Sequence, residues 1–529
     1  MSDWNDRRAK ATERFRLFDS EIDEIEDRVS RFLTEQKLEQ HEVTRLRLTM
    51  RELLLRIAEH YGQNKECTVR MDRRFGSAGI LVTYTGNAYN PTALGRDSLG
   101  DQWSVRLLTT IGLVPEWSYR GTVNRLVLRP QKKTSVTAFV LAAVLAVLLG
   151  LTGSVLPEPF LSFAVSAVLT PLFDTFLGLL GCFSGLMVFF SVISGICGIG
   201  DTSTLGRVGR VILLRFIGQT CLWCAVGCIA GIFLFHPDFS AALQLPQLLG
   251  GLIPRDPVSP FRDGCGGQIL FLSGFIGAML LFSGGRTERV RELAEQFDLI
   301  FLAAMEHLCK LMPLFVFLTL LRQLWSGPSP SLLYLWKPLA VILTGSLLLV
   351  LLKLFLTALR LRLRPRRLLN LLLPSFLAAL TAASTSSVFG QTMDNCEARL
   401  GVSHKLLLIA LPIGNVLCLP AVSFCSSTLL LYLAERCGVP VSLSWLFLLM
   451  IVVSGLCFTV PSVPGALLAC FGLVLRQLGL PPECYVVMAA LNVFVDAVSA
   501  ACCNAFVQLE LAAQAELLDM LDRRVPGAE

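Results

Sequence analysis

Charged side chains are scarce in this chain, because Asp, Glu, Lys and Arg make up only 16% of its 529 residues. Soluble globular domains carry about 25%. Hydrophobic residues reach 53%, and this balance indicates that much of the chain lies in a membrane. The shortage is uneven, since residues 1–133 hold 42 of the 86 charged residues. The chain therefore divides into a polar N-terminal part and an apolar remainder.

Histidine is also rare, and the five histidines are scattered along the chain. No nucleophile, base and orienting acid are grouped, so we expect no enzyme, no catalytic residue and no cofactor. Of the 17 cysteines, 16 follow residue 133, mostly in apolar runs where a thiol behaves as a small hydrophobe. This pattern predicts neither a disulfide framework nor a metal site. The net charge of +6 does not indicate nucleic acid, because the later basic residues sit in short clusters between apolar runs.

The chain opens on a polar stretch, and its first long apolar run begins near Val136. We therefore expect no signal peptide and a cytosolic first domain. The predicted organisation is a soluble α/β domain at 1–133, a transmembrane domain at 134–515 and a cytosolic tail at 516–529.

Eight apolar stretches are long enough to cross a hydrocarbon core of about 30 Å as helices. They lie near 135–155, 158–198, 208–236, 266–284, 297–325, 331–358, 405–432 and 482–510. Threading them from a cytosolic N-terminus puts every loop rich in Lys and Arg on one side, which the positive-inside rule assigns to the cytosol. The same thread makes 237–264, 326–331 and 433–442 external. The sequence predicts a multi-pass protein of the plasma (inner) membrane with both termini in the cytosol.

Two further apolar stretches, near 370–400 and 443–476, are interrupted by Ser, Thr, Gly and Pro. Broken backbone at membrane depth is tolerated only where it is buried in protein or lines a watery cavity. In the thread above, the two stretches enter from opposite sides, and such paired broken segments mark the binding site of many transporters. The pattern therefore predicts eight transmembrane helices plus two re-entrant hairpins.

Four stretches carry a family resemblance. Residues 370–412 contain a proline, a serine-rich tip and the sequences LGVS and LP, and they are joined by 189–209, by LCKLMPLFVF at 308–317 and by SVPGALLACFGLVLRQLGLP at 462–481. In this order they resemble the dicarboxylate/amino acid:cation symporters, which include the glutamate transporters. The resemblance covers about 135–515. It implies the glutamate transporter-like fold, a homotrimer and an elevator-like movement of the hairpin-bearing part.

The resemblance also implies a substrate site at both hairpin tips and on the last helix. It assigns substrate binding to Ser384, Thr385, Ser386, Ser387, Val463, Pro464, Gly465, Asp496 and Ser499. It assigns cation coupling to Asn415, Cys418, Asn492 and Asp496.

The seventh helix departs from the family pattern. After LPIG at 411–414, the run Asn415-Val416-Leu417-Cys418 replaces the family's sodium-binding Asn-Met-Asp-Gly-Thr segment. The ordinary sodium site is therefore not expected, and whether a proton or sodium is coupled stays open. Pro420 is still expected to break this helix, because it removes a backbone donor.

The eighth helix departs as well. Ser499 stands where members with acidic substrates have an arginine, which argues against glutamate or aspartate as the substrate. Asp496 has two interpretations. It is either a carboxylate satisfied by a neighbouring Ser or Asn, or a functional group for a substrate amine or a proton. The second is favoured, because an ionisable group at mid-membrane costs about 2.5–3.5 kcal/mol.

The N-terminal domain carries a second resemblance. Residues 12–62 are expected to be helical, from three- and four-residue spacing of Phe15, Phe18, Ile22, Ile25 and Val29. With the segments up to 130 they resemble the histidine-kinase-type ATPase fold of anti-sigma factors. Glu52 and Gly86 match its nucleotide site, whereas Arg56 and Tyr84 replace its magnesium and adenine ligands. Ser98–Asp101 is a remnant of its phosphate lid. We expect a degenerate domain that regulates or contacts a cytosolic protein.

Two functions fit these patterns. The first is a secondary active transporter, symporter-like, for a small amino acid or carboxylate. The second is a transport-inactive sensor that binds the solute and signals through 1–133. Both explain a retained fold with eroded ion sites, and the sequence favours transport. The expected partners are the solute, the lipid bilayer and further copies of this chain.

Overall fold

A computed structural model gives the fold of this chain. It describes residues 12–35, 40–62, 64–74, 77–89, 91, 116–120, 122–128, 136–154, 157–202, 206–254, 256–283, 287–325, 336–459, 466–481 and 484–521. The chain forms two compact units, Met1–Lys133 with Ser386–Pro412, and Thr134–Thr385 with Ile413–Glu529. The predicted site residues Val463, Pro464 and Gly465, and the lid remnant Ser98–Asp101, lie outside the described residues.

The first unit contains a five-stranded antiparallel sheet with two helices. The strand order is β1-β2-β3-β5-β4, and the elements are β1 (Thr12–Arg16), α1 (Asp19–Glu35), α2 (Gln40–Tyr61), β2 (Glu66–Arg74), β3 (Ser77–Thr85), β4 (Glu116–Arg120) and β5 (Val123–Leu128). Ile22, Ile25 and Val29 are buried at helical spacing on α1, and Ile80 and Val82 alternate along β3. These two periods place one apolar face of each element in the core.

One expectation for this unit is wrong, because 12–62 is not helical throughout. Thr12–Arg16 is a strand that pairs with β2. Phe15 and Leu17 are buried whereas Phe18 is exposed, so the apolar residues here alternate with the period of a strand. The helical spacing holds only from α1 onward.

The first unit also includes α16 (Phe389–Ala398), which packs against α2. Arg47 Nη2 on α2 lies 3.7 Å from Asp394 Oδ1 on α16. Helix α17 (His404–Leu417) then runs from the first unit into the second. A segment next to the serine-rich tip therefore groups with the N-terminal elements.

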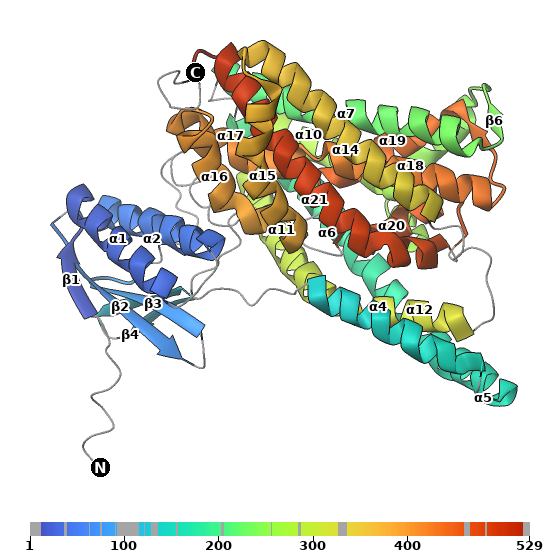
Figure 1. Ribbon diagram of the computed structural model, residues 1–529, viewed down its shortest axis with the longest axis horizontal. Coiled ribbons are helices and arrows are strands. Elements are labelled where there is room, and N and C mark those ends of the chain that lie inside the picture. The colour runs from blue at the N-terminus through green and yellow to red at the C-terminus, as the bar shows by residue number, and fades with distance from the viewer. Residues whose placement is uncertain are drawn as a thin grey trace. The chain divides into compact units, whose positions relative to one another are not determined.

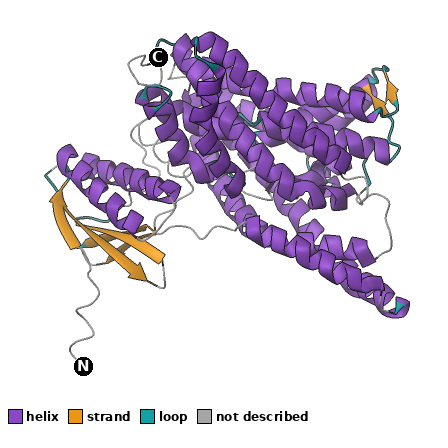
Figure 2. Cartoon of the chain, in the orientation of Figure 1, coloured by secondary structure: helices purple, strands orange, loops and turns teal. Residues whose placement is uncertain are grey.

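The described part of the second unit consists of helices and one short parallel strand pair, β6 (Phe239–Ser240) with β7 (Val441–Ser442) (Figure 2). Its helices are α4 (Val136–Leu151), α5 (Glu158–Phe163), α6 (Thr170–Thr202), α7 (Gly206–Phe235), α8 (Leu245–Leu252), α9 (Ser259–Asp263), α10 (Gly266–Phe282), α11 (Glu288–Cys309), α12 (Met312–Trp325), α14 (Trp336–Leu361), α15 (Pro365–Ala382), α18 (Pro420–Arg436), α19 (Leu443–Cys457), α20 (Ala466–Gln477) and α21 (Cys484–Leu517).

Five stretches among the described residues are long and apolar enough to cross a membrane. They are Glu158–Cys197, Val211–Phe235, Trp336–Leu361, Ala410–Arg436 and Phe494–Leu517. A bent pair, α11 with α12, makes a sixth if it counts as one span. Large apolar side chains also stay exposed along α14, among them Leu348, Phe355 and Leu359, as expected of a surface that faces lipid. A multi-pass helical membrane protein is thus supported. The count of eight spans stays a prediction, since α4 and α10 have 16 and 17 residues.

Helix α18 lies at the centre of the second unit. It contacts α7, α14, α19 and α21, and α21 also lies beside α14 and α15 (Figure 1). Gly227 allows the backbones of α7 and α18 to approach closely, because a Cβ atom at this position would lie 2.8 Å from the Phe424 backbone oxygen of α18. Small residues allow such close helix packing in membranes. Helix α21 carries three of the predicted site residues, Asn492, Asp496 and Ser499, whereas Ser384 and Thr385 follow α15 and Cys418 precedes α18.

Candidate functional site

Helix α21 brings three predicted site residues together. Asn492 Nδ2 donates a hydrogen bond to Asp496 Oδ2 at 2.8 Å, and Ser499 Oγ donates to the Asp496 backbone oxygen at 3.2 Å. Asn492 and Ser499 are buried, and Asp496 is half-buried. Spacings of four and three residues put all three on one helix face. The structure thus places an amide beside the Asp496 carboxylate, and this carboxylate remains partly accessible.

The serine-rich tip follows a helix that ends abruptly. Helix α15 ends at Ala382, and Ala383 then adopts a left-handed conformation with φ of 48°. Ser384 and Thr385 come next and are buried, Thr385 to 3% exposure. Among the described residues, Thr385 Oγ1 has no hydrogen-bond partner. An unsatisfied buried hydroxyl costs about 1–3 kcal/mol, so this oxygen is suited to a bound polar ligand.

The other two tip residues begin the next element. Ser386 and Ser387 lie in a single 3₁₀ turn that precedes α16. Ser386 is half-buried. Both belong to the first unit, whereas Ser384 and Thr385 belong to the second. The division between the units therefore runs through the predicted tip.

Helix α15 is tied to α21 by polar contacts that the sequence did not reveal. Asn504 Nδ2 donates to the Ser375 backbone oxygen at 3.2 Å, and Gln508 Nε2 donates to Ser375 Oγ at 2.9 Å. All three residues are buried. Hydrogen bonds between buried groups fix the register of two helices, because any slip would leave them unsatisfied.

The seventh-helix region is broken where Pro420 predicted. Helix α17 ends at Leu417 and α18 begins at Pro420. Thr220 of α7 spans the gap, since its Oγ1 donates to the Leu417 backbone oxygen at 2.7 Å and accepts from the Leu419 backbone N–H at 3.1 Å. The break is therefore confirmed, and a side chain of another helix satisfies it.

The predicted cation-coupling residues Asn415 and Cys418 lie beside this break, and both are buried. Neither supplies a carboxylate. Among the described residues there is no group of three or more His, Cys, Asp or Glu that could hold a metal ion. The donors gathered here are amide, thiol and backbone groups.

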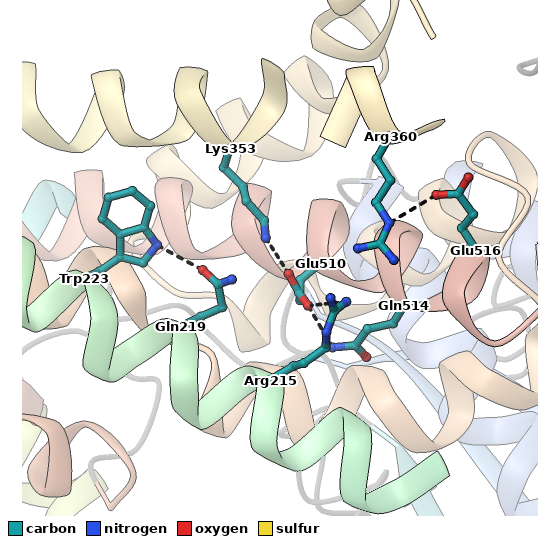
Figure 3. A network of polar contacts seen from close by, with 8 residues as sticks. All are labelled: Arg215, Gln219, Trp223, Lys353, Arg360, Glu510, Gln514 and Glu516. Carbon is teal, nitrogen blue, oxygen red and sulfur yellow. Dashed lines mark hydrogen bonds and ion pairs between the residues drawn. The ribbon is translucent and has the colours of Figure 1, made fainter. Parts of the chain in front are cut away.

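A buried ionic network joins three helices (Figure 3). The Glu510 carboxylate of α21 lies 2.5 Å from Lys353 Nζ of α14 and 3.3 Å from Arg215 Nη1 of α7. Gln514 Nε2 also donates to Glu510 Oε1 at 3.3 Å. The Glu510 side chain is 3% exposed, Lys353 11% and Arg215 33%. Two cations therefore share one buried carboxylate.

This network was missed in the sequence, although a signal was present. Lys353 and Glu510 each stand in an otherwise apolar run, and an ionisable residue in such a run is expected to have a partner. Arg360 and Glu516 form a second pair at 3.4 Å, with side chains 37% and 24% exposed (Figure 3). On α7, Trp223 Nε1 donates to Gln219 Oε1 at 3.2 Å.

Arg56 and Tyr84 of the first unit stand where the ATPase resemblance predicts ligands of magnesium and adenine. Both side chains form hydrogen bonds with neighbouring residues of the same unit. Arg56 is buried, its Nη1 donates to the Pro91 backbone oxygen at 2.6 Å, and its Nε lies 3.6 Å from Glu52 Oε1. Tyr84 is also buried and donates its hydroxyl to the Tyr89 backbone oxygen at 2.7 Å. Burial raises the pKa of the Tyr84 phenol. The resemblance to the ATPase fold and the loss of nucleotide binding stay predictions.

Comparison with known proteins gives a family match and distant relatives. A family model described as sodium:dicarboxylate symporter family matches residues 136–513. A C4-dicarboxylate transport protein of Cupriavidus necator is 25% identical over 293 residues, which cover 52% of this chain and 67% of that protein. C4-dicarboxylate transport protein 2 of Ralstonia nicotianae is 27% identical over 316 residues, 53% of this chain and 68% of its own length. A C4-dicarboxylate transport protein of Anaeromyxobacter sp. (strain K) is 27% identical over 323 residues, which cover 57% of this chain and 72% of that protein.

Proposed function

Because the chain belongs to the sodium:dicarboxylate symporter family, we propose that it is a secondary active transporter of a small solute that carries a carboxylate. Its relatives are C4-dicarboxylate transport proteins by name, so C4-dicarboxylates are the first class to test. Asp496 makes amino acids the second class, because its carboxylate suits an ammonium group.

The observation that carries this proposal is the buried Thr385 hydroxyl, combined with the register of α15 on α21. Arg360 at the end of α14 pairs with Glu516, and α15 begins five residues after Arg360. Ten residues further on, Ser375 contacts Asn504 and Gln508. Helix α15 therefore runs antiparallel to α21.

The same register bears on the start of the tip. From Ser375 to the end of α15 at Ala382 the helix advances seven residues, or about 10 Å at the helical rise of 1.5 Å per residue. The same distance back along α21, from midway between Asn504 and Gln508, leads to Ser499, one turn from Asp496. This register supports the proposal that Ser384 and Thr385 lie at the level of Asp496 in the second unit.

The chemistry of this level suits a carboxylate solute. Hydroxyls and free backbone N–H groups at a helix break bind an anion without a buried cation. Ser384 and Thr385 supply such hydroxyls, and the family resemblance adds Ser386, Ser387, Val463, Pro464 and Gly465 as further substrate-binding residues. Ser499 offers no charge to a second carboxylate, so a dicarboxylate is bound there through neutral donors or as its monoanion.

Coupling, orientation and assembly extend the proposal. Asp496 takes up a proton or a substrate ammonium, and Asn415, Cys418 and Asn492 line the former cation positions without a sodium-binding carboxylate. Both termini are cytosolic, the protein sits in the plasma membrane as a homotrimer, and the hairpin-bearing part moves as an elevator.

Solute uptake by the full chain in proteoliposomes tests transport. We expect accumulation of labelled succinate, fumarate or a neutral amino acid when a proton gradient is imposed, and little without it. Empty liposomes processed in the same way serve as the control. Saturable solute binding without uptake under a proton or a sodium gradient would contradict the transport proposal.

Substitution of Asp496 tests the site. Asp496→Asn is nearly isosteric and keeps the acceptor for Asn492, so the fold should persist. Losing a charge-assisted contact in a desolvated site costs about 2–5 kcal/mol, so we expect solute affinity to fall more than tenfold, or its pH dependence to vanish. His307→Gln is the control, because among the described residues the His307 side chain hydrogen-bonds only with the Ala303 backbone oxygen, one turn earlier in its own helix. Unchanged binding by Asp496→Asn at every pH would make this aspartate structural.

One observation favours the alternative, a solute sensor. Within the first unit, α16 packs on α2 and Arg47 approaches Asp394, so the element after the serine-rich tip contacts α2. A solute that displaces the tip would then shift α16 and, through this contact, α2. Arg47→Glu separates the two functions, because it removes the attraction between Arg47 and Asp394. A sensor should lose its signal in this variant, whereas a transporter should keep its solute uptake.

A further inference from the structure

Two thiols of the second unit lie almost in bonding contact. Cys437 Sγ and Cys484 Sγ are 3.1 Å apart. A disulfide has an S–S distance of about 2.05 Å, so the sulfurs need to approach by only about 1 Å. Cys437 is exposed and Cys484 is buried. The Cys437 thiol is thus accessible to a reagent, and the adjacent buried Cys484 thiol is placed to act as the resolving thiol.

The two cysteines close off the second interrupted stretch. Cys437 directly follows α18, and Cys484 is the first residue of α21. The 46 residues between them contain α19, α20 and the predicted tip Val463-Pro464-Gly465. Start and end of this segment therefore meet at the cysteine pair.

The proposed orientation puts this pair on the outer side of the membrane, since 433–442 is an external loop and α21 runs from there to the cytosol. Disulfides persist in such oxidising surroundings. We propose that Cys437 and Cys484 are a modification site, at which the chain acquires a reversible disulfide by exchange with a protein or small-molecule disulfide. This rests on the proposed orientation and not on transport.

The exchange balances in two steps. The Cys437 thiolate attacks one sulfur of the incoming disulfide, forms a mixed disulfide and releases the first partner thiol. The Cys484 thiolate then attacks Cys437 Sγ and releases the second partner thiol. Two electrons pass from the cysteine pair to the partner disulfide, and the two cysteine protons end on the released thiols.

The crosslink has a measurable consequence. A disulfide stabilises mainly by restricting the unfolded chain, and the effect grows with the length of the closed loop. Closing 46 residues should therefore raise the melting temperature of the oxidised protein above that of the reduced protein. Cys437→Ser should have the melting temperature of the reduced parent protein, both with and without reductant.

Thiol counting tests the proposal in isolated membranes that hold the full chain. Free thiols are blocked with N-ethylmaleimide under denaturing conditions, disulfides are then reduced, and the released thiols take a maleimide polyethylene glycol that shifts the band. We expect two tags on the parent and none on Cys437→Ser. Cys265→Ser is the matched control, because Cys265 lies in another loop of the same predicted side, and it should keep two tags.

A second arm tests the orientation with a membrane-impermeant maleimide on intact cells. After a membrane-impermeant reductant is added, Cys437 should become labelled from outside in the parent and not in Cys437→Ser. No tags on the parent would overturn the proposal, and so would labelling of Cys437 only after the cells are opened. Two tags that persist in Cys437→Ser would assign the disulfide to other cysteines and likewise refute it. Solute uptake, measured on the same samples, separates these outcomes from a failure of the transport proposal.

Discussion

Removal of the Glu510 charge is the sharpest perturbation that the second unit offers. Glu510→Gln keeps the shape of the side chain and one acceptor oxygen, so packing in α21 should survive. Lys353 and Arg215, however, would then face each other without the carboxylate that lies 2.5 Å and 3.3 Å from them. The Lys353 side chain is only 11% exposed, and it has little access to water in compensation.

The expected loss follows from this burial. Opposite unit charges about 4 Å apart attract by about 4 kcal/mol at an effective dielectric constant of 20, and removing one partner of a buried pair destabilises by about 3–5 kcal/mol. Arg215 is 33% exposed and adds less. The outer pair Arg360–Glu516 has side chains 37% and 24% exposed, for which about 0–1 kcal/mol is typical.

Unfolding of the purified protein by titration with a denaturing detergent checks these magnitudes. We expect Glu510→Gln to lose about 3–5 kcal/mol, and the matched control Glu516→Gln to lose no more than about 1 kcal/mol. Adding Lys353→Met to Glu510→Gln should recover much of the loss, because the unpaired buried cation is removed. If Glu510→Gln is as stable as Glu516→Gln, the network does not hold α7, α14 and α21 together.

Local features of this fold were readable because each depends on nearby residues. Apolar runs predicted the membrane helices, and Pro420 predicted the break between α17 and α18 because it lacks a backbone donor. The strand at Thr12–Arg16 was missed, since it is only five residues long and Phe15 fits a helical spacing with Phe18 and Ile22 beyond it. Only pairing with β2, in which Phe15 lies opposite Cys67, decides between helix and strand.

The site was readable only in part for the same reason. The grouping of Asn492, Asp496 and Ser499 follows from positions on one helix. The contacts of Gln508 with Ser375 and of Glu510 with Arg215 join residues 133 and 295 positions apart. A sequence shows that such polar residues need partners in a membrane, and it does not say which partners they have. The tertiary packing of α15, α14 and α7 against α21 supplies that choice.

Three further outcomes are expected. The full chain should show no magnesium-dependent ATP binding by calorimetry, because Arg56 replaces the magnesium ligand of the ATPase fold that the N-terminal domain is predicted to resemble, and micromolar affinity would refute this. Its melting temperature should not rise with sodium beyond the effect of choline, because a ligand stabilises only by binding the folded state, and a saturable sodium-specific rise would show an intact sodium site. Thr220→Val should destabilise by about 2–4 kcal/mol, since the Leu417 oxygen and the Leu419 N–H both lose their hydroxyl partner and a buried unsatisfied group costs about 1–3 kcal/mol. The matched control is Thr319→Val, equally buried, whose hydroxyl donates to the Phe315 oxygen one turn earlier in the same helix and should cost about 1 kcal/mol or less. Equal losses in the two variants would mean that Thr220 does not support the broken helix.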